Sequence, residues 1–150
     1  MALRTYIDTS VVGGVFDAEF REASEMFFRA VDRDEIIIVV SDLLQEELAH
    51  APAQVQSYLT RFPESHVERL ELTEEAVILG DRYLAERVVG ATSRVDCQHI
   101  AIATIDRVDV LVSWNFKHIV NLRRIRGYNS VNLRSGYSSL EIRTPAEVLE

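Results

Sequence analysis

The sequence predicts an α/β fold, a three-layer α/β/α sandwich with a mostly parallel central sheet. Two unbroken apolar runs, at residues 36–40 and 110–112, have the composition of strands that are buried on both faces. Between them lie longer stretches in which apolar residues recur at every third or fourth position, as in amphipathic helices. This alternation is typical of parallel sheets, and a chain of this length fits a single domain over residues 1–150.

The first half of the chain divides at its strand and turn signals. The first strand is expected to end at Asp8, and small residues with two glycines follow it as a loop. Ser41 is a suitable N-cap for the helix after the central strand, and Pro52 ends that helix. The expected elements are strands over residues 3–7, 36–40 and 67–72 and helices over residues 17–33, 42–50 and 53–62.

The second half of the chain contains the strongest sign of a buried helix. The helix that begins at Asp96 is apolar on nearly every side, which predicts that it lies inside the protein. Thr73 is a suitable N-cap, Gly127 is expected to close a later helix, and residues 144–147 (TPAE) have a helix-start signature. The expected elements are helices over residues 76–88, 96–105 and 118–126, strands over residues 110–112, 130–133 and 140–142, and a helix that starts near residue 144.

Composition excludes several classes of protein. The net charge of −8 and the pI of about 5.0 argue against a passive nucleic-acid binder, which would normally be basic. The longest apolar run is too short to span a bilayer, and the N-terminus has no signal-peptide pattern. The single cysteine, Cys97, excludes an internal disulfide, and we expect it to fill space in the core of a cytoplasmic protein.

Positive charge is concentrated late in the chain, because no acidic residue lies between Asp109 and Glu141. Two interpretations of this interval stay open. The basic side chains either form a solvated helix face or form a patch that faces phosphate groups. The residues of this interval that carry the charge are Lys117, Arg123, Arg124, Arg126 and Arg134.

Three acids and an amide stand at comparable places in the predicted sheet. Asp8 follows the first strand, and Glu47 lies in the helix after the second. Asp96 opens the helix before the 110–112 strand, and Asn115 closes that strand. In a parallel α/β fold these points can meet at one edge of the sheet. Carboxylates gathered there would repel one another, and a hard divalent cation such as Mg²⁺ or Mn²⁺ would relieve the repulsion and could activate water.

Each acid also has a purely structural interpretation. Asp8 could cap a following helix, and Asp96 lies three residues after Ser93, which is the spacing of a capping box. Glu47 could be an exposed helix charge, and its neighbour Glu46 could equally face inward. His99 is expected to be a polar neighbour of the site, because no cysteine or second histidine completes a zinc site.

Four segments together resemble the PIN domain, and in particular the short, single-domain, VapC-like PIN proteins of bacteria and archaea. They are Y-I-D-T-S near the N-terminus, S-D-L-L-Q-E-E-L after the second strand, D-C-Q-H-I-A-I-A-T on the buried helix, and V-D-V-L-V-S-W-N-F-K-H-I after it. The resemblance covers essentially the whole chain. It favours Glu47 over Glu46, since the family motif places its acid directly before the leucine at position 48.

The resemblance implies a metal-dependent ribonuclease that cleaves single-stranded or looped RNA with Mg²⁺ or Mn²⁺. Asp8, Glu47 and Asp96 would be metal ligands, directly or through water, and the basic patch would contact RNA. The family often has a fourth acid where this chain has Asn115, so a second metal would bind more weakly here. Toxin members of the family pair with a small antitoxin and often form homodimers, so both partners are expected. The residues that would support the site are Thr9, Ser10, His99 and Ser113.

Two other functions are compatible with the sequence. A PIN module that binds RNA or a protein partner without cleaving would suit the amide at Asn115 and the acidic pI. A phosphatase-like hydrolase would use Asp8 as a nucleophile, but such enzymes usually carry a second acid two residues later, where Ser10 stands.

Overall fold

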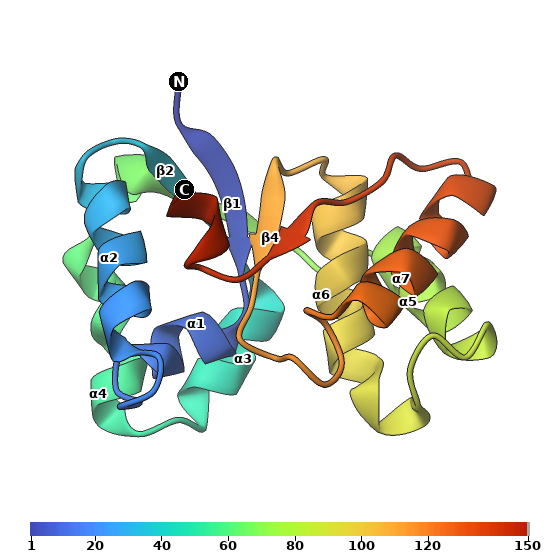
Figure 1. Cartoon of the computed structure of the whole chain (residues 1–150), viewed down its shortest axis with the longest axis horizontal. Coiled ribbons are helices and arrows are strands. Elements are labelled where there is room, and N and C mark those ends of the chain that lie inside the picture. The colour runs from blue at the N-terminus through green and yellow to red at the C-terminus, as the bar shows by residue number, and fades with distance from the viewer. Residues whose placement is uncertain (150) are drawn as a thin grey trace.

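The central sheet lies between two groups of helices in the computed structural model, which describes residues 1–149 (Figure 1). The described residues form a five-stranded sheet in the order β3-β2-β1-β4-β5. Every strand pair is parallel, and the central strand pairs Tyr6 with Val39 on one side and with Leu111 on the other. The predicted α/β sandwich is therefore confirmed. The strands are β1 (Leu3–Ile7), β2 (Ile36–Ser41), β3 (Val67–Leu70), β4 (Val110–Val112) and β5 (Ile142–Arg143).

Helices α1 to α4 cover one face of the sheet, and α5 to α7 cover the other (Figure 1). Alternate residues of each strand point to opposite faces, so β1 contributes Tyr6 to one core and Ile7 to the other. The helices are α1 (Thr9–Gly14), α2 (Arg21–Asp32), α3 (Asp42–Ala49), α4 (Ala53–Gln56), α5 (Glu74–Ala85), α6 (Arg94–Ile105) and α7 (Leu122–Arg134). Short 3₁₀ turns are η1 (Tyr58–Arg61), η2 (Glu64–His66), η3 (Ala91–Ser93) and η4 (Glu147–Leu149).

The buried helix predicted to begin at Asp96 is α6, and most of its residues are inaccessible to solvent. Cys97, a residue of this helix, is fully buried in the core, as expected. Burial raises the pKa of its thiol to about 12, so the thiolate is not formed at neutral pH. Among residues 1–149, no helix has the length and apolar character that a membrane span requires.

The strand predicted over residues 130–133 is wrong, and so is the helix end at Gly127. Helix α7 runs without interruption through both. A Cβ atom at position 127 would lie 2.8 Å from Cγ1 of Val88, so the glycine allows α7 to pack closely against the end of α5. The helix starts at Leu122, later than predicted, because the Asn121 side chain accepts a hydrogen bond from the Arg124 amide (2.9 Å) and caps it.

Other boundaries shift at the ends of elements. The predicted helix over 17–33 begins only at Arg21, the one over 53–62 divides after Gln56, and the last strand is Ile142–Arg143 and not 140–142. Residues 9–14, expected as a loop, form α1. The capping box at Thr144 is confirmed, because Glu147 donates its amide to the Thr144 hydroxyl (3.2 Å) and accepts from the Thr144 amide (2.9 Å).

Candidate active site

Asp8 follows β1 at the carboxyl edge of the sheet, and its carboxylate joins β1 to the tip of β4. Oδ1 accepts a hydrogen bond from the Ser10 hydroxyl (2.5 Å), and Oδ2 accepts one from the Ser113 hydroxyl (2.6 Å). Asp8 holds the N-cap position of α1, but its side chain makes no capping bond. It is buried, and each of its two oxygens accepts one hydrogen bond.

The segment after β4 is held in place by a series of short bonds. The Ser10 hydroxyl accepts the backbone amide of Trp114, and the Ser113 hydroxyl accepts that of Asn115, both at 2.9 Å. The Asn115 Oδ1 atom in turn accepts the amide of His118 (2.9 Å). The two serines and the amide therefore fix the backbone tip that faces Asp8.

Asp96 lies in the first turn of α6 and faces this tip. The Asn115 Nδ2 group donates to Oδ2 of Asp96 over 3.5 Å, a long hydrogen bond. Ser93 occupies the N-cap position but makes no side-chain capping bond, so the capping-box interpretation of Asp96 fails. The fold thus directs Asp96 toward the end of β4, as expected for a side chain of the site.

Glu47 is connected to the centre of the sheet through a buried histidine. Its Oε1 atom lies 2.7 Å from Nε2 of His99, and Nδ1 of His99 lies 2.6 Å from the Tyr6 hydroxyl. The Tyr6 hydroxyl is also 2.7 Å from the Ser41 hydroxyl. The Nε2–H of His99 donates to the Glu47 carboxylate, and Nδ1 shares a hydrogen bond with the Tyr6 hydroxyl. Glu46, by contrast, is exposed, so Glu47 is the acid that α3 directs toward the site.

The surroundings raise the pKa of two of the three acids and lower the pKa of the third. Burial raises the pKa of Asp8 above its usual 3.8, and the hydrogen bonds from Ser10 and Ser113 offset only part of this rise. Burial also raises the pKa of Asp96, and the charge of Asp8 raises it further. Burial acts on Glu47 as well, but the hydrogen bond and charge of His99 outweigh it and lower its pKa below the usual 4.5. The Asp8 and Asp96 charges therefore repel each other, and a cation between them would favour both ionised forms.

The donor atoms at this edge are the hard oxygen atoms that Mg²⁺ and Mn²⁺ prefer. Besides the carboxylates, the buried Thr9 hydroxyl makes no hydrogen bond, although it lies near enough to Glu47 to lower the pKa of that acid slightly. Within residues 1–149, no group of three or more carboxylate, imidazole and thiol side chains converges closely enough to enclose a metal. The residues fit a divalent cation by chemical type, and Asp8 and Asp96 are its first candidate ligands.

Sequence patterns alone did not predict the aromatic side chains that support the tip of β4 from behind. The Trp114 ring stacks on Phe20 with 4.4 Å between the ring centroids, and its Nε1–H donates to the Ser24 hydroxyl (2.9 Å). Gly14 of α1 leaves room for this ring, since a Cβ atom there would lie 2.8 Å from Nε1 of Trp114. These contacts fix Trp114 between Ser113 and Asn115 and so position both polar neighbours. The tryptophan between two site residues was the available signal.

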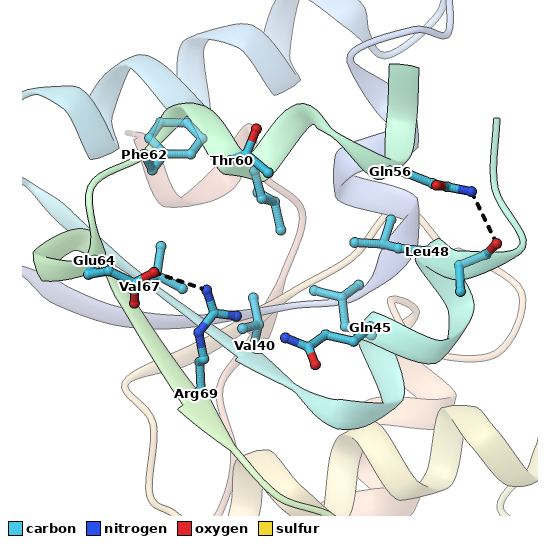
Figure 2. A pocket seen from close by; sticks show the side chains of 12 residues that line it. Val40, Gln45, Leu48, Gln56, Thr60, Phe62, Glu64, Val67 and Arg69 are labelled. Carbon is cyan, nitrogen blue, oxygen red and sulfur yellow. Dashed lines mark hydrogen bonds and ion pairs between the residues drawn. The ribbon is translucent and has the colours of Figure 1, made fainter. Parts of the chain in front are cut away.

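A separate cavity of about 470 Å³ lies between α3, η1 and β3, and it contains none of the acids of the site. Figure 2 shows Leu48 and Gln45 of α3 on one side of it and Arg69 of β3 on another, with Arg69 paired to Glu64 at 3.5 Å. Helix α3 therefore borders two different regions, with Glu47 directed to His99 and Leu48 to this cavity.

Comparisons with known proteins identify the fold. No protein-family model matches the chain, and no curated protein sequence matches it. The solved structures of VapBC2 from Rickettsia felis, bound to a DNA fragment from their promoter, include a chain with 14% identity and a TM-score of 0.58, covering 95% of this chain and 98% of that one. VapC20 from Mycobacterium tuberculosis, a sarcin-ricin loop cleaving toxin, has 10% identity and a TM-score of 0.57, covering 91% and 98%.

FitAcB from Neisseria gonorrhoeae has 10% identity and a TM-score of 0.55, covering 94% of this chain and 97% of that chain. At such low identities the likeness shows the fold alone. It confirms the VapC-like PIN fold that the four sequence segments predicted, over nearly the whole length of each chain.

Proposed function

We propose that this chain, which has a VapC-like PIN fold, is a Mg²⁺- or Mn²⁺-dependent endoribonuclease that hydrolyses RNA phosphodiester bonds. The observation that carries the proposal is the position of Asp8 at the carboxyl edge of the sheet, bonded to Ser10 and Ser113 where β1 and β4 end. Ligands of open parallel sheets bind at this edge. Asp96 faces the same tip, as its bond with Asn115 indicates.

In this proposal Asp8, Asp96 and Glu47 hold the metal, directly or through water. A bound divalent cation would supply Lewis acidity and a water of lowered pKa. The hydroxyls of Ser10 and Ser113 orient the Asp8 carboxylate and favour its ionised form. His99 holds Glu47 in a fixed direction. These residues place negative oxygen atoms at set points before any substrate arrives.

We propose that Asn115 acts differently from the acid that PIN domains often have at this position. Its Oδ1 atom is used by the His118 amide, while its Nδ2 group points to Asp96. An amide N–H can donate to a phosphate oxygen, which a carboxylate cannot do. Because Asn115 adds no charge, we propose one strongly bound metal and not two.

The substrate and partners are also proposals. VapC20 is described as a toxin that cleaves the sarcin-ricin loop, which supports RNA as the substrate of this chain. VapBC2 supports a small antitoxin as a partner of a toxin in a type II pair. We further propose a homodimer that acts in the cytoplasm, with RNA contacts from Lys117, Arg123, Arg124 and Arg126.

The test combines metal binding with cleavage. Mn²⁺ titrated into the metal-free protein by calorimetry should bind to the wild type and not to Asp96→Asn. Cleavage of an end-labelled single-stranded RNA should require the metal and should fall by about 100-fold or more in Asp8→Asn and Asp96→Asn. Glu46→Gln is the matched control for Glu47→Gln, since the two acids are neighbours on α3 and only Glu47 contacts His99.

A non-catalytic PIN module is the second candidate, and the amide at Asn115 favours it. That function predicts RNA or protein binding that survives Asp8→Asn, without cleavage at any metal concentration. Wild-type protein that is folded, binds RNA and cleaves none would replace the nuclease proposal with this one.

A further inference from the structure

Four arginines line a hollow of about 330 Å³ between the end of α5 and the side of α7, two helices on the same side of the sheet (Figure 1). One acid, Glu86, also lines it and pairs with Arg134 at 2.8 Å. The other three cations make no ion pair with an acid of residues 1–149. These three residues, called the arginine hollow below, are Arg87, Arg123 and Arg124.

Such a group is unexpected in this protein. The chain has 24 acidic and 16 basic residues, so acids are available to neutralise most of its cations. Instead three guanidinium groups lie together in the hollow, none of them paired with a carboxylate, and their mutual repulsion has an electrostatic cost. Concave surfaces lined by one sign of charge concentrate the potential and attract ions of the other sign.

The backbone holds these cations in set positions. Arg87 follows the C-cap of α5 and has a left-handed backbone conformation, with a φ of 58°. Gly127 brings α7 against Val88, which forms part of the lining. Arg124 donates from Nη1 to the Val88 carbonyl (2.5 Å) and from Nε to the Lys117 carbonyl (3.5 Å). Its guanidinium therefore connects α7 to Val88, which follows α5, and to Lys117, which precedes α7.

Both walls of the hollow lead to the candidate active site. The chain that leaves α5 after Arg87 continues through η3 into the first turn of α6, which carries Asp96. The segment that precedes α7 begins at Asn115, and Asn115 contacts Asp96. Short chain segments therefore connect both walls of the arginine hollow to the residues around Asp96.

We propose that the arginine hollow binds a backbone phosphate of the RNA strand at a position away from the cleaved bond. The inference rests on the proposed function and extends it, because Arg87 and the hollow lie outside the acid cluster. Arginine presents paired N–H groups that match the oxygens of a phosphate, and three guanidinium groups without a carboxylate partner suit a phosphodiester better than a single carboxylate. Arg126 lies outside the lining, so it is not part of the arginine hollow.

The experiment measures RNA binding without cleavage. Protein that carries Asp96→Asn is titrated into a labelled, unstructured RNA of about 12 nucleotides, at several salt concentrations, by fluorescence anisotropy. Adding Arg87→Gln and Arg123→Gln should weaken binding by about tenfold and make the log–log salt dependence shallower by about 0.7, the value for one lost phosphate contact on a single strand.

Arg107→Gln is the matched control. Arg107 is also exposed, also follows a helix and also has a left-handed backbone, with a φ of 55°. It precedes β4, so it lies at the opposite edge of the sheet from Asp8. Its substitution removes one arginine charge, as Arg87→Gln does by itself, and should leave both the affinity and the salt slope unchanged.

Each other result has a distinct meaning. An unchanged affinity and slope in the double arginine variant would overturn the arginine hollow while leaving the nuclease proposal intact. An equal loss in Arg107→Gln would also overturn it, by showing an effect of net charge alone. Inorganic phosphate is titrated into the same proteins. If the protein with both arginines binds phosphate more tightly than it binds RNA, and the double arginine variant does not bind phosphate, the hollow is a site for free phosphate. RNA binding by none of the proteins would overturn the proposed function itself.

Discussion

The Glu47 carboxylate lies 2.7 Å from Nε2 of His99, although the two residues are on helices that cover opposite faces of the sheet. The imidazole is buried, while the carboxylate keeps 38% of its side-chain surface exposed. Through Nδ1 of His99 and the Tyr6 hydroxyl, the contact also reaches β1. A single row of bonds therefore connects α3, α6 and the strand that ends at Asp8.

This contact predicts a pH-dependent effect of Glu47→Gln. Because the folded state lowers the pKa of Glu47, its ionised form stabilises the protein above about pH 4.5, and this contribution disappears as pH falls through the folded pKa. The substitution should reduce the free energy of unfolding at about pH 7 by roughly 0.5–1 kcal/mol, a small value since the group is partly exposed. Urea unfolding of both proteins across this pH range measures the difference, which should shrink toward about pH 3.5.

Glu46→Gln is the control, since Glu46 is an exposed neighbour on the same helix. Its effect should be small at every pH. A wild-type advantage over Glu47→Gln that stays constant from neutral to acidic pH would show that ionisation of Glu47 does not contribute.

Tyr6→Phe should disturb the same row of bonds from its other end. The change removes the hydroxyl between His99 and Ser41 and leaves buried polar atoms of both without that partner. We expect a loss of about 1–3 kcal/mol in the free energy of unfolding. Combined with Glu47→Gln, the two losses should be non-additive by about 0.5 kcal/mol or more, because the residues share His99.

Tyr128→Phe provides the comparison for this cycle. Tyr128 is equally buried, and its hydroxyl donates to the His118 carbonyl (2.8 Å), away from Glu47. The decrease in the free energy of unfolding caused by Tyr128→Phe should simply add to the decrease caused by Glu47→Gln. If the effects of Tyr6→Phe and Glu47→Gln on the free energy of unfolding were strictly additive, His99 would not couple the two residues.

Asp8→Asn should stabilise the protein while removing activity. Burial raises the pKa of Asp8, so its ionised form opposes folding above about pH 4, and this penalty fades as the acid is protonated at lower pH. The neutral amide should raise the free energy of unfolding by about 1 kcal/mol at about pH 7, with no gain near about pH 3. Chemical unfolding in metal-free buffer, with a cleavage assay in parallel, tests both effects, and a clear destabilisation at neutral pH would contradict the explanation.

The sequence predicted the parts of the fold that depend on local composition. Five β-branched residues, at 36–40, formed the expected strand, and the apolar helix after Asp96 is buried as expected. The places of Asp8 and Asp96 at the carboxyl edge also followed from the order of strands and helices. In a parallel sheet the direction of each strand determines which end of it a following residue occupies.

Contacts between distant residues could not be predicted in this way. Gly127 was expected to end a helix, but it lies within α7, where the absence of a side chain leaves room for Val88. Nothing local shows that His99 faces Glu47 and not Glu46, nor that Ser41 bonds to Tyr6 instead of capping α3. These choices depend on how helices pack across the sheet.

The two adjacent glycines of α1 offer a sharp test of how the tip of β4 is supported. Alanine is the better helix former by about 1 kcal/mol, so both substitutions would stabilise an isolated helix. Around Gly13 no atom lies within 4 Å of an added Cβ, whereas at Gly14 the Cβ would lie 2.5 Å from the Ser24 hydroxyl and 2.8 Å from Nε1 of Trp114.

Gly13→Ala should therefore raise the free energy of unfolding by about 0.5–1 kcal/mol, and Gly14→Ala should lower it by about 1–3 kcal/mol. The second change must displace the Trp114 ring from Ser24, so its tryptophan fluorescence should shift as well, while that of Gly13→Ala should not. Trp114 lies between Ser113 and Asn115, so the same displacement should weaken Mn²⁺ binding in Gly14→Ala alone. Equal stabilities and spectra for the two variants would show that the tryptophan adjusts freely and does not position the residues beside Asp8.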